Sequence, residues 1–357
     1  MDVNKSLVRR SITIWLILGI VLIYFQVIIG GITRLTGSGL SITKWEIVIG
    51  TLPPLSNDAW NEVFDLYKET PQYQKINEGM TMSSFKFIYF WEYLHRLWAR
   101  SMGFVFIVPF LVFWKKGWLS KVMMRKLLVV FFMAGLVGLF GWIMVASGLI
   151  ERPWVNAYKL AIHLSLALVV LGYLLWVFLQ YRYPREDIEA RLPGLKYFLV
   201  AMGIQIFLGG IMSGAKASLV YPEWPDYGGS WLPAVLLERG VWNVDNFVNY
   251  DSSPFLAGLI QICHRSLAYI LIISGIYILI KHKRLITSDR LWFIPGMLVT
   301  MLITQAVLGI LVLYGSKSTV PVFLGIAHQV VAIAILLCTI IIYYFSDRSG
   351  RKVTASI

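Results

Sequence analysis

Eight long apolar segments constrain this chain more than any other feature of its sequence. They run over 12–33, 86–113, 127–149, 158–180, 196–213, 255–280, 291–314 and 321–345. Each is long enough to cross a hydrocarbon core about 30 Å thick as a helix. A segment that crosses lipid alone must satisfy its own backbone hydrogen bonds, so all eight are predicted to be helices. The sequence therefore predicts an all-α membrane protein with eight transmembrane helices.

The distribution of charge supports this interpretation and predicts an orientation. Only 14% of the 357 residues are charged, and the net charge is +13. Nineteen of the 32 basic residues, but six of the 19 acidic ones, lie at the two termini and in the loops 114–126, 181–196 and 281–290. Basic residues concentrate in cytoplasmic loops, so we expect the lipid bilayer, and no nucleic acid, as a partner. We predict a multi-pass protein of the cell (inner) membrane, with both termini cytoplasmic and the first apolar run retained as a span.

The two halves of the chain repeat one another. The matched elements are Gln26 with Gly30–Gly31 and Gln205 with Gly209–Gly210, then His95-Arg96 and His264-Arg265, then His163 and His328. The offsets between them are 179, 169 and 165 residues. Each half holds four spans, so both halves enter the membrane in the same orientation. We predict two pseudo-symmetric four-helix bundles, over residues 1–185 and 186–357.

Four of the five histidines lie one each in the even-numbered spans. They are His95, His163, His264 and His328, and all lie about 8 to 14 Å below the same predicted membrane face. Neutral imidazole is a good axial ligand for haem iron, and a flat macrocycle between two helices takes one ligand from each side. The pattern predicts one porphyrin site in each half. The fifth histidine, His282, lies in a basic loop and receives no role.

Other interpretations of these residues remain open. The histidines could serve proton relays or helix-to-helix hydrogen bonds. Zinc is disfavoured because the paired histidines are 68 and 64 residues apart, whereas structural zinc sites use closely spaced ligands. Arg96 and Arg265 need partners inside lipid, either haem propionates or other side chains such as Glu92. The glycine pairs permit close approach of either a helix or a flat ring.

Glu92 distinguishes the halves. It lies one helical turn before His95, whereas the matching residue before His264 is the neutral Gln261. A carboxylate inside a membrane is costly, which makes function the first hypothesis, and a salt bridge to Arg96 is the alternative. We therefore predict that the chemistry belongs to the N-terminal half and a resident haem to the C-terminal half.

Two further features concern the loops and the cysteines. Trp60, Phe64 and Tyr67 recur at helical spacing in the loop 34–85, which predicts a surface helix that either packs on the bundle or acts as a lid. Cys263 and Cys338 both lie in apolar runs, so no loop disulfide is expected and both are predicted to be small buried side chains.

At these residues the sequence resembles the haem A synthase family, in its mitochondrial and alphaproteobacterial-like branch. The most specific segments are GGITRLTGSGLSITKWEIVIGTLPPL, PQYQKINEGMTMSSFKFIYFWEYLHRLWAR and the later HR and AHQ motifs. The resemblance covers nearly the whole chain. It implies oxidation of a methyl group of haem O to a formyl group, through a hydroxymethyl intermediate, to give haem A for terminal oxidase assembly.

The resemblance also implies roles for individual residues. His95 and His163 would flank the substrate haem O, with Glu92 as the catalytic acid beside it. His264 and His328 would ligate a haem b cofactor. Many bacterial relatives carry a cysteine pair in an outer loop, which this chain lacks. Haem O synthase and oxidase assembly factors are the implied protein partners.

Two other functions compete with the enzyme. A b-type cytochrome for transmembrane electron transfer would explain the histidines but not a carboxylate in one half alone. A transporter or haem carrier would explain the repeat and carry out no oxidation. The sequence leaves open the electron acceptor and the oligomeric state, a homo-oligomer included.

Overall fold

The structure, a computed structural model, describes residues 3–44, 52–150, 152–184, 193–281 and 293–345. Within these residues every regular element is a helix, and eight helices are long and apolar enough to cross a membrane. They are α1 (Val3–Leu35), α4 (Met82–Lys115), α5 (Lys121–Ala146), α6 (Ala157–Arg182), α7 (Pro193–Gly214), α10 (Phe255–Lys281), α12 (Ile294–Gly315) and α13 (Val322–Phe345). The predicted fold class is confirmed.

Several helices extend beyond their predicted apolar segments. The helix α4 begins at Met82 rather than at residue 86, because the side chain of Thr81 caps it by accepting from the amide of Ser84. Similarly, Ser120 caps α5, so the basic turn from Lys121 is helical instead of part of a loop. Apolar windows locate the part of a helix that crosses lipid, whereas capping residues decide where the helix begins.

Much of the surface of these helices is apolar. Phe104, Phe132 and Ile273 expose 71%, 67% and 70% of their area. On a water-soluble protein such a surface would be a liability, but on membrane spans it faces lipid. The basic segments 185–192 and 282–292, with His282, lie outside the described residues, so the predicted orientation stays a prediction.

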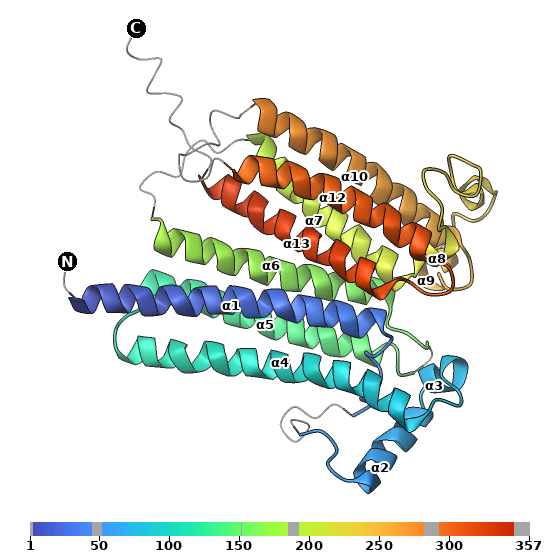
Figure 1. The fold of residues 1–357 in the computed structure, drawn as a ribbon, viewed down its shortest axis with the longest axis horizontal. Coiled ribbons are helices and arrows are strands. Elements are labelled where there is room, and N and C mark those ends of the chain that lie inside the picture. Colours follow the sequence, from blue (N-terminus) through green and yellow to red (C-terminus); the bar gives the residue numbers. More distant parts are fainter. Residues whose placement is uncertain (1–2, 45–51, 151, 185–192, 282–292, 346–357) are drawn as a thin grey trace. The chain divides into compact units, whose positions relative to one another are not determined.

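The chain forms two compact units, Met1–Ala167 and Leu168–Ile357. In the N-terminal unit, α1 packs along α4, and the short helices α2 (Asn57–Lys68) and α3 (Pro71–Ile76) lie at the end of α1 away from the N-terminus (Figure 1). The division falls inside α6, whereas the predicted one, after residue 185, falls among residues that the structure does not describe. The pseudo-symmetry of the halves remains a prediction.

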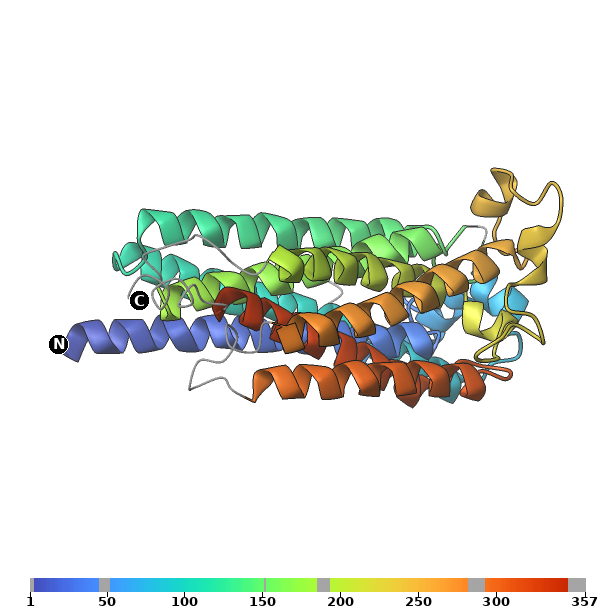
Figure 2. The ribbon, with the colours of Figure 1, turned by 90° about the horizontal axis from the view of Figure 1, so that it is seen from above.

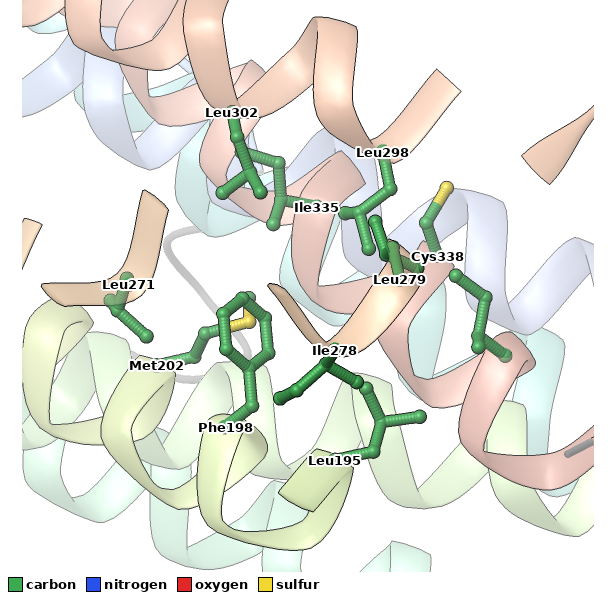
Figure 3. Close-up of a cluster of buried hydrophobic side chains, with 11 residues drawn as sticks. Leu195, Phe198, Met202, Leu271, Ile278, Leu279, Leu298, Leu302, Ile335 and Cys338 are labelled. Carbon is green, nitrogen blue, oxygen red and sulfur yellow. The ribbon is translucent and has the colours of Figure 1, made fainter. Parts of the chain in front are cut away.

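In the C-terminal unit, α7 packs on α10, and α12 packs on α13 (Figure 2). Side chains from all four helices meet in one buried apolar cluster, which includes Phe198, Leu271, Leu302 and Ile335 (Figure 3). The three short helices α8 (Ala217–Val220), η2 (Ala234–Leu237) and α9 (Asp245–Val248) lie between α7 and α10 in the chain.

The cysteine prediction is half right. Cys338 belongs to this buried cluster, as expected of a small apolar side chain (Figure 3). Cys263 is instead exposed on α10. An apolar run does not tell which face of a membrane helix meets lipid, so sequence alone placed it wrongly. Both cysteines are free thiols.

The surface helix predicted in the first long loop is confirmed as α2. Its buried Phe64 and Tyr67 stack on Phe85 of α4, with ring centroids 4.7 and 5.1 Å apart. Ile88 and Tyr89 complete the cluster. The helix therefore covers the first turns of α4, which lead directly to Glu92, and its role as a lid stays a prediction.

A hydrogen-bonded chain ties α2 and α3 to the exit of α1. The Tyr67 hydroxyl donates to Gln72 over 3.1 Å, and the Gln72 amide donates to the Gly37 carbonyl over 2.9 Å. Burial raises the pKa of Tyr67 above its ordinary value, only partly opposed by a hydrogen bond from Asn77, so the phenol keeps its proton. The chain fixes the loop that follows α1 relative to α4.

Replacing Phe85 by alanine is expected to loosen α2. Phe85 is fully buried between rings of α2 and α4, and removing such a ring costs about 3–5 kcal/mol. Hydrogen–deuterium exchange across residues 57–68 should rise. Phe87→Ala is the matched control, because Phe87 is 55% exposed on the same helix; equal exchange in the two variants would contradict the packing role.

Candidate functional site

His95 lies on α4, where it faces α1. The Gln26 amide nitrogen donates to the backbone carbonyl of His95 over 3.1 Å and lies 3.2 and 3.3 Å from the two ring nitrogens. Gly30, one turn further along α1, touches the same ring. A Cβ atom at Gly30 would lie 3.0 Å from Cε1 of His95, closer than an ordinary contact. The glycine pair thus makes room for an imidazole, which decides between the two predicted uses of that pair.

His163 lies near the start of α6 and faces α5. Its Nδ1 atom lies 3.0 Å from the carbonyl oxygen of Val137. A carbonyl only accepts, so the ring donates from Nδ1 and keeps a lone pair on Nε2. A Cβ atom at Gly141 would lie 2.9 Å from Cε1 of His163. Helix α5 therefore orients His163 with its own backbone, at a turn without side chains.

His264 repeats the arrangement of His95 in the C-terminal unit. The Gln205 amide donates to the His264 carbonyl and lies 3.1 Å from Nε2 of the ring. Gly209 is the glycine against which the ring packs, with a hypothetical Cβ 3.2 Å from Cε1. The Nδ1 atom of His264 is buried without a hydrogen-bond partner.

His328 faces α12 as His163 faces α5. A Cβ atom at Gly309 would lie 3.1 Å from Cε1 of His328. The ring contact is here a side chain, because the Gln305 amide nitrogen lies 3.0 Å from Nε2 of His328. Nδ1 of His328 is buried and has no hydrogen-bond partner.

Within each unit the two imidazoles act on one another. His95 and His163 interact electrostatically, and so do His264 and His328. Among the described residues, no three or more His, Cys, Asp or Glu side chains gather as a metal centre. The structure thus brings the predicted histidines together as pairs.

Glu92 is 97% buried on α4 and has three hydrogen-bond donors. One oxygen accepts from the Ser41 hydroxyl over 2.7 Å and from the Ile42 amide over 2.8 Å. The other accepts from Arg96 over 2.6 Å, which makes a buried ion pair. Arg96 also donates to the carbonyl of Ile42 over 3.1 Å. The salt-bridge alternative is thus part of the structure, and the pair holds the segment after α1 in place.

The matching place in the C-terminal unit is neutral. The Gln261 amide donates to the carbonyls of Ala217 and Tyr221 over 2.7 and 2.8 Å, and its oxygen accepts from Arg265. Arg265 also donates to the Glu223 carbonyl over 2.7 Å and lies over the Tyr227 ring. Both arginines therefore anchor a loop, but only Arg96 does so through a carboxylate.

A cavity of about 280 Å³ lies beside the ion pair. It is bordered by the segment from Ser41 to Lys44, by α2 and by the Tyr89, Tyr93 and Arg96 side chains of α4. Glu92 thus lies behind Arg96, at the end of α4 that α2 covers.

Comparison with known proteins bears on this arrangement. Residues 13–340 match the COX15-CtaA family, described as cytochrome oxidase assembly protein. The chain belongs to this family. A "Heme A synthase" of Flavobacterium johnsoniae is 37% identical over 92% of this chain and 95% of its own length. One from Bradyrhizobium diazoefficiens is 39% identical over 92% of this chain and 89% of its own.

The resemblance predicted from the motifs is therefore confirmed at the level of the family. A third relative, the "Heme A synthase" of Nitrosospira multiformis, is 36% identical over 94% of this chain. Since relatives from such different bacteria are about equally similar, the matches support the COX15-CtaA family as a whole.

The histidine pairs fit the haem that this family binds. In the C-terminal unit each ring has one nitrogen at a glutamine amide and the other buried without a partner. In the N-terminal unit, His163 presents Nε2 as a lone-pair donor. Such a nitrogen, with its ring oriented by a second contact, is the usual form of a haem ligand. The glycines leave room for the rings.

Sequence reasoning missed several residues of these sites. Ser41 lies inside the most specific motif but received no role, because the fold alone brings it from the loop after α1 to Glu92. Gly141 and Gly309 occur as single glycines in apolar runs, which carry no signal by themselves. Their common position relative to His163 and His328 was the available clue.

Proposed function

We propose that this protein is a haem A synthase that oxidises the methyl group of haem O to a formyl group, through a hydroxymethyl intermediate. The observation that carries the proposal is the buried Glu92 near one histidine pair and its neutral replacement, Gln261, near the other. The shared scaffold supports haem binding in both halves. The unshared carboxylate supports chemistry in one of them.

The N-terminal histidines, His95 and His163, bind the substrate haem O in this proposal. Conversion of the methyl group with water to hydroxymethyl releases two electrons and two protons, and further oxidation to formyl releases two of each again. Positive charge develops on the ring carbon, and the anionic Glu92 stabilises it. All donors to Glu92 are hydrogen-bonded in place, which favours this electrostatic role over proton transfer.

The C-terminal histidines, His264 and His328, hold a haem b. When bound, this group supplies one-electron transfer. Gln205 and Gln305 orient the two rings, and the electron acceptor beyond them is open. We further propose that both termini are cytoplasmic and that haem O synthase and oxidase assembly factors act next to this protein, consistent with the description of the family.

The extracted pigment tests the proposed function. The protein is produced with haem O synthase, and its haems are extracted and identified by mass and absorption. A formyl haem is expected in the extract, and its absence in an otherwise folded, haem-loaded protein would contradict the proposal. Unchanged haem O beside a redox-active haem b would instead indicate a b-type cytochrome.

Single histidine variants test the division between the halves. His264→Ala and His328→Ala should lose the low-spin haem b spectrum in protein made without haem O. By contrast, His95→Ala and His163→Ala should keep that spectrum and lose formyl haem production. The measurement is the absorption of the purified variants and the composition of their extracted haem. Loss of haem b in His95→Ala would contradict the assignment.

A further inference from the structure

The second histidine of each half has its orienting contact at the same place, but of a different kind. The contact of His163 is the backbone carbonyl of Val137, four residues before Gly141. The contact of His328 is the side chain of Gln305, four residues before Gly309. A residue is thus added in the C-terminal half where the N-terminal half uses only its peptide backbone.

The Gln305 amide has an unused acceptor. Its nitrogen lies 3.0 Å from Nε2 of His328, while its oxygen is buried without a partner, and so is Nδ1 of His328. A half-turn of the amide places the oxygen at the same ring nitrogen. That oxygen then accepts from the ring N–H, and the other ring nitrogen keeps the lone pair that iron needs.

Gln305 differs in this respect from the other two glutamines. The amide nitrogens of Gln26 and Gln205 each donate to the backbone carbonyl of their histidine over 3.1 Å. Those bonds fix which end of the amide faces the ring. No such bond to a backbone carbonyl holds the amide nitrogen of Gln305, so this amide turns at little cost.

We propose that Gln305 is the hydrogen-bond acceptor that positions His328 and sets the reduction potential of the C-terminal haem. This rests on the haem b site of the proposed function. An acceptor at the free ring N–H makes an imidazole a more basic ligand. A more basic ligand favours ferric over ferrous iron and lowers the potential. Gln305 thereby keeps this haem a weaker oxidant than an unassisted histidine pair.

The test uses full-length protein made in cells without haem O, so that only the resident haem is present. Gln305→Met removes the acceptor at nearly constant volume, and Gln305→Glu keeps an oxygen there. Thr304→Val is the control, since Thr304 is the exposed neighbour, bonded only to its own helix at Thr300. The midpoint potential is measured by redox titration of the absorption spectrum.

A tenfold weaker preference for ferric haem in Gln305→Met is expected, which corresponds to a rise of about 59 mV. Gln305→Glu should show no rise, and neither should the control. Equal potentials in the Met variant and wild type, or a rise in the Glu variant, would overturn the inference. If the Met variant retains no haem, the Glu variant decides alone. Should His328→Ala keep the wild-type haem spectrum, the haem b site itself fails, and this inference falls with it.

Discussion

Replacing Glu92 by glutamine is expected to lower formyl haem production by about 100-fold or more, while the C-terminal haem stays bound. The substitution keeps the shape of the side chain and removes its charge, so it removes stabilisation of the positive charge that develops on the substrate carbon. Haem composition per hour of induced expression measures the effect. The absorption of the resident haem reports whether the variant is folded.

The ion pair with Arg96 complicates a single substitution. Removing one partner of a buried pair leaves the other charge uncompensated, which by itself costs about 3–5 kcal/mol. The double variant Glu92→Gln/Arg96→Gln restores neutrality. If Glu92 serves only to hold Arg96 and the segment after α1, the double variant should regain activity over the single one.

If Glu92 acts on the substrate, the double variant stays as inactive as Glu92→Gln. Ser41→Ala is the control for the surrounding contacts, because it removes one donor to Glu92 and leaves the charge. We expect it to lose about tenfold or less, in line with one hydrogen bond of about 1 kcal/mol. Recovery of formyl haem in the double variant would make the carboxylate a structural residue.

The parts of the fold that sequence predicted are those that lipid imposes. An apolar run must become a helix when it crosses a membrane alone, so all eight spans followed from composition and length. The face of α2 with Phe64 and Tyr67 followed from helical spacing in the same way. Cys263 shows the limit, because the side of a span that meets lipid depends on neighbours that the run does not encode.

The site was predictable as far as the internal repeat carries it. His95 and His264 stand out because the same residue recurs in the same span, and Glu92 because its counterpart is Gln261. The contacts between elements were not predictable. Val137 contributes a backbone carbonyl, which any residue offers, and Ile42 contributes an amide. Their roles arise only once α5 lies against His163 and the segment after α1 lies against Glu92.

Gly141 gives the second large expected effect. A valine at this position is expected to lower formyl haem production by about 100-fold, because its Cβ would lie 2.9 Å from Cε1 of His163 and 3.3 Å from Nδ1. The ring must move, and its bond to the Val137 carbonyl then breaks. A displacement of about 1 Å in a group that positions a substrate costs about 100-fold in rate.

Gly138 provides the matched control on the same helix. A Cβ atom at Gly138 meets no atom within 4 Å, so Gly138→Val tests the general cost of valine for glycine in α5. Formyl haem production near wild type in that variant, with the resident haem retained in both, would assign the loss to His163. Equal activity of the two variants would show instead that the α5 backbone does not orient this imidazole for the reaction. In that case the substrate haem would need a ligand other than His163, because the bond to Val137 is what holds that ring's Nε2 lone pair available.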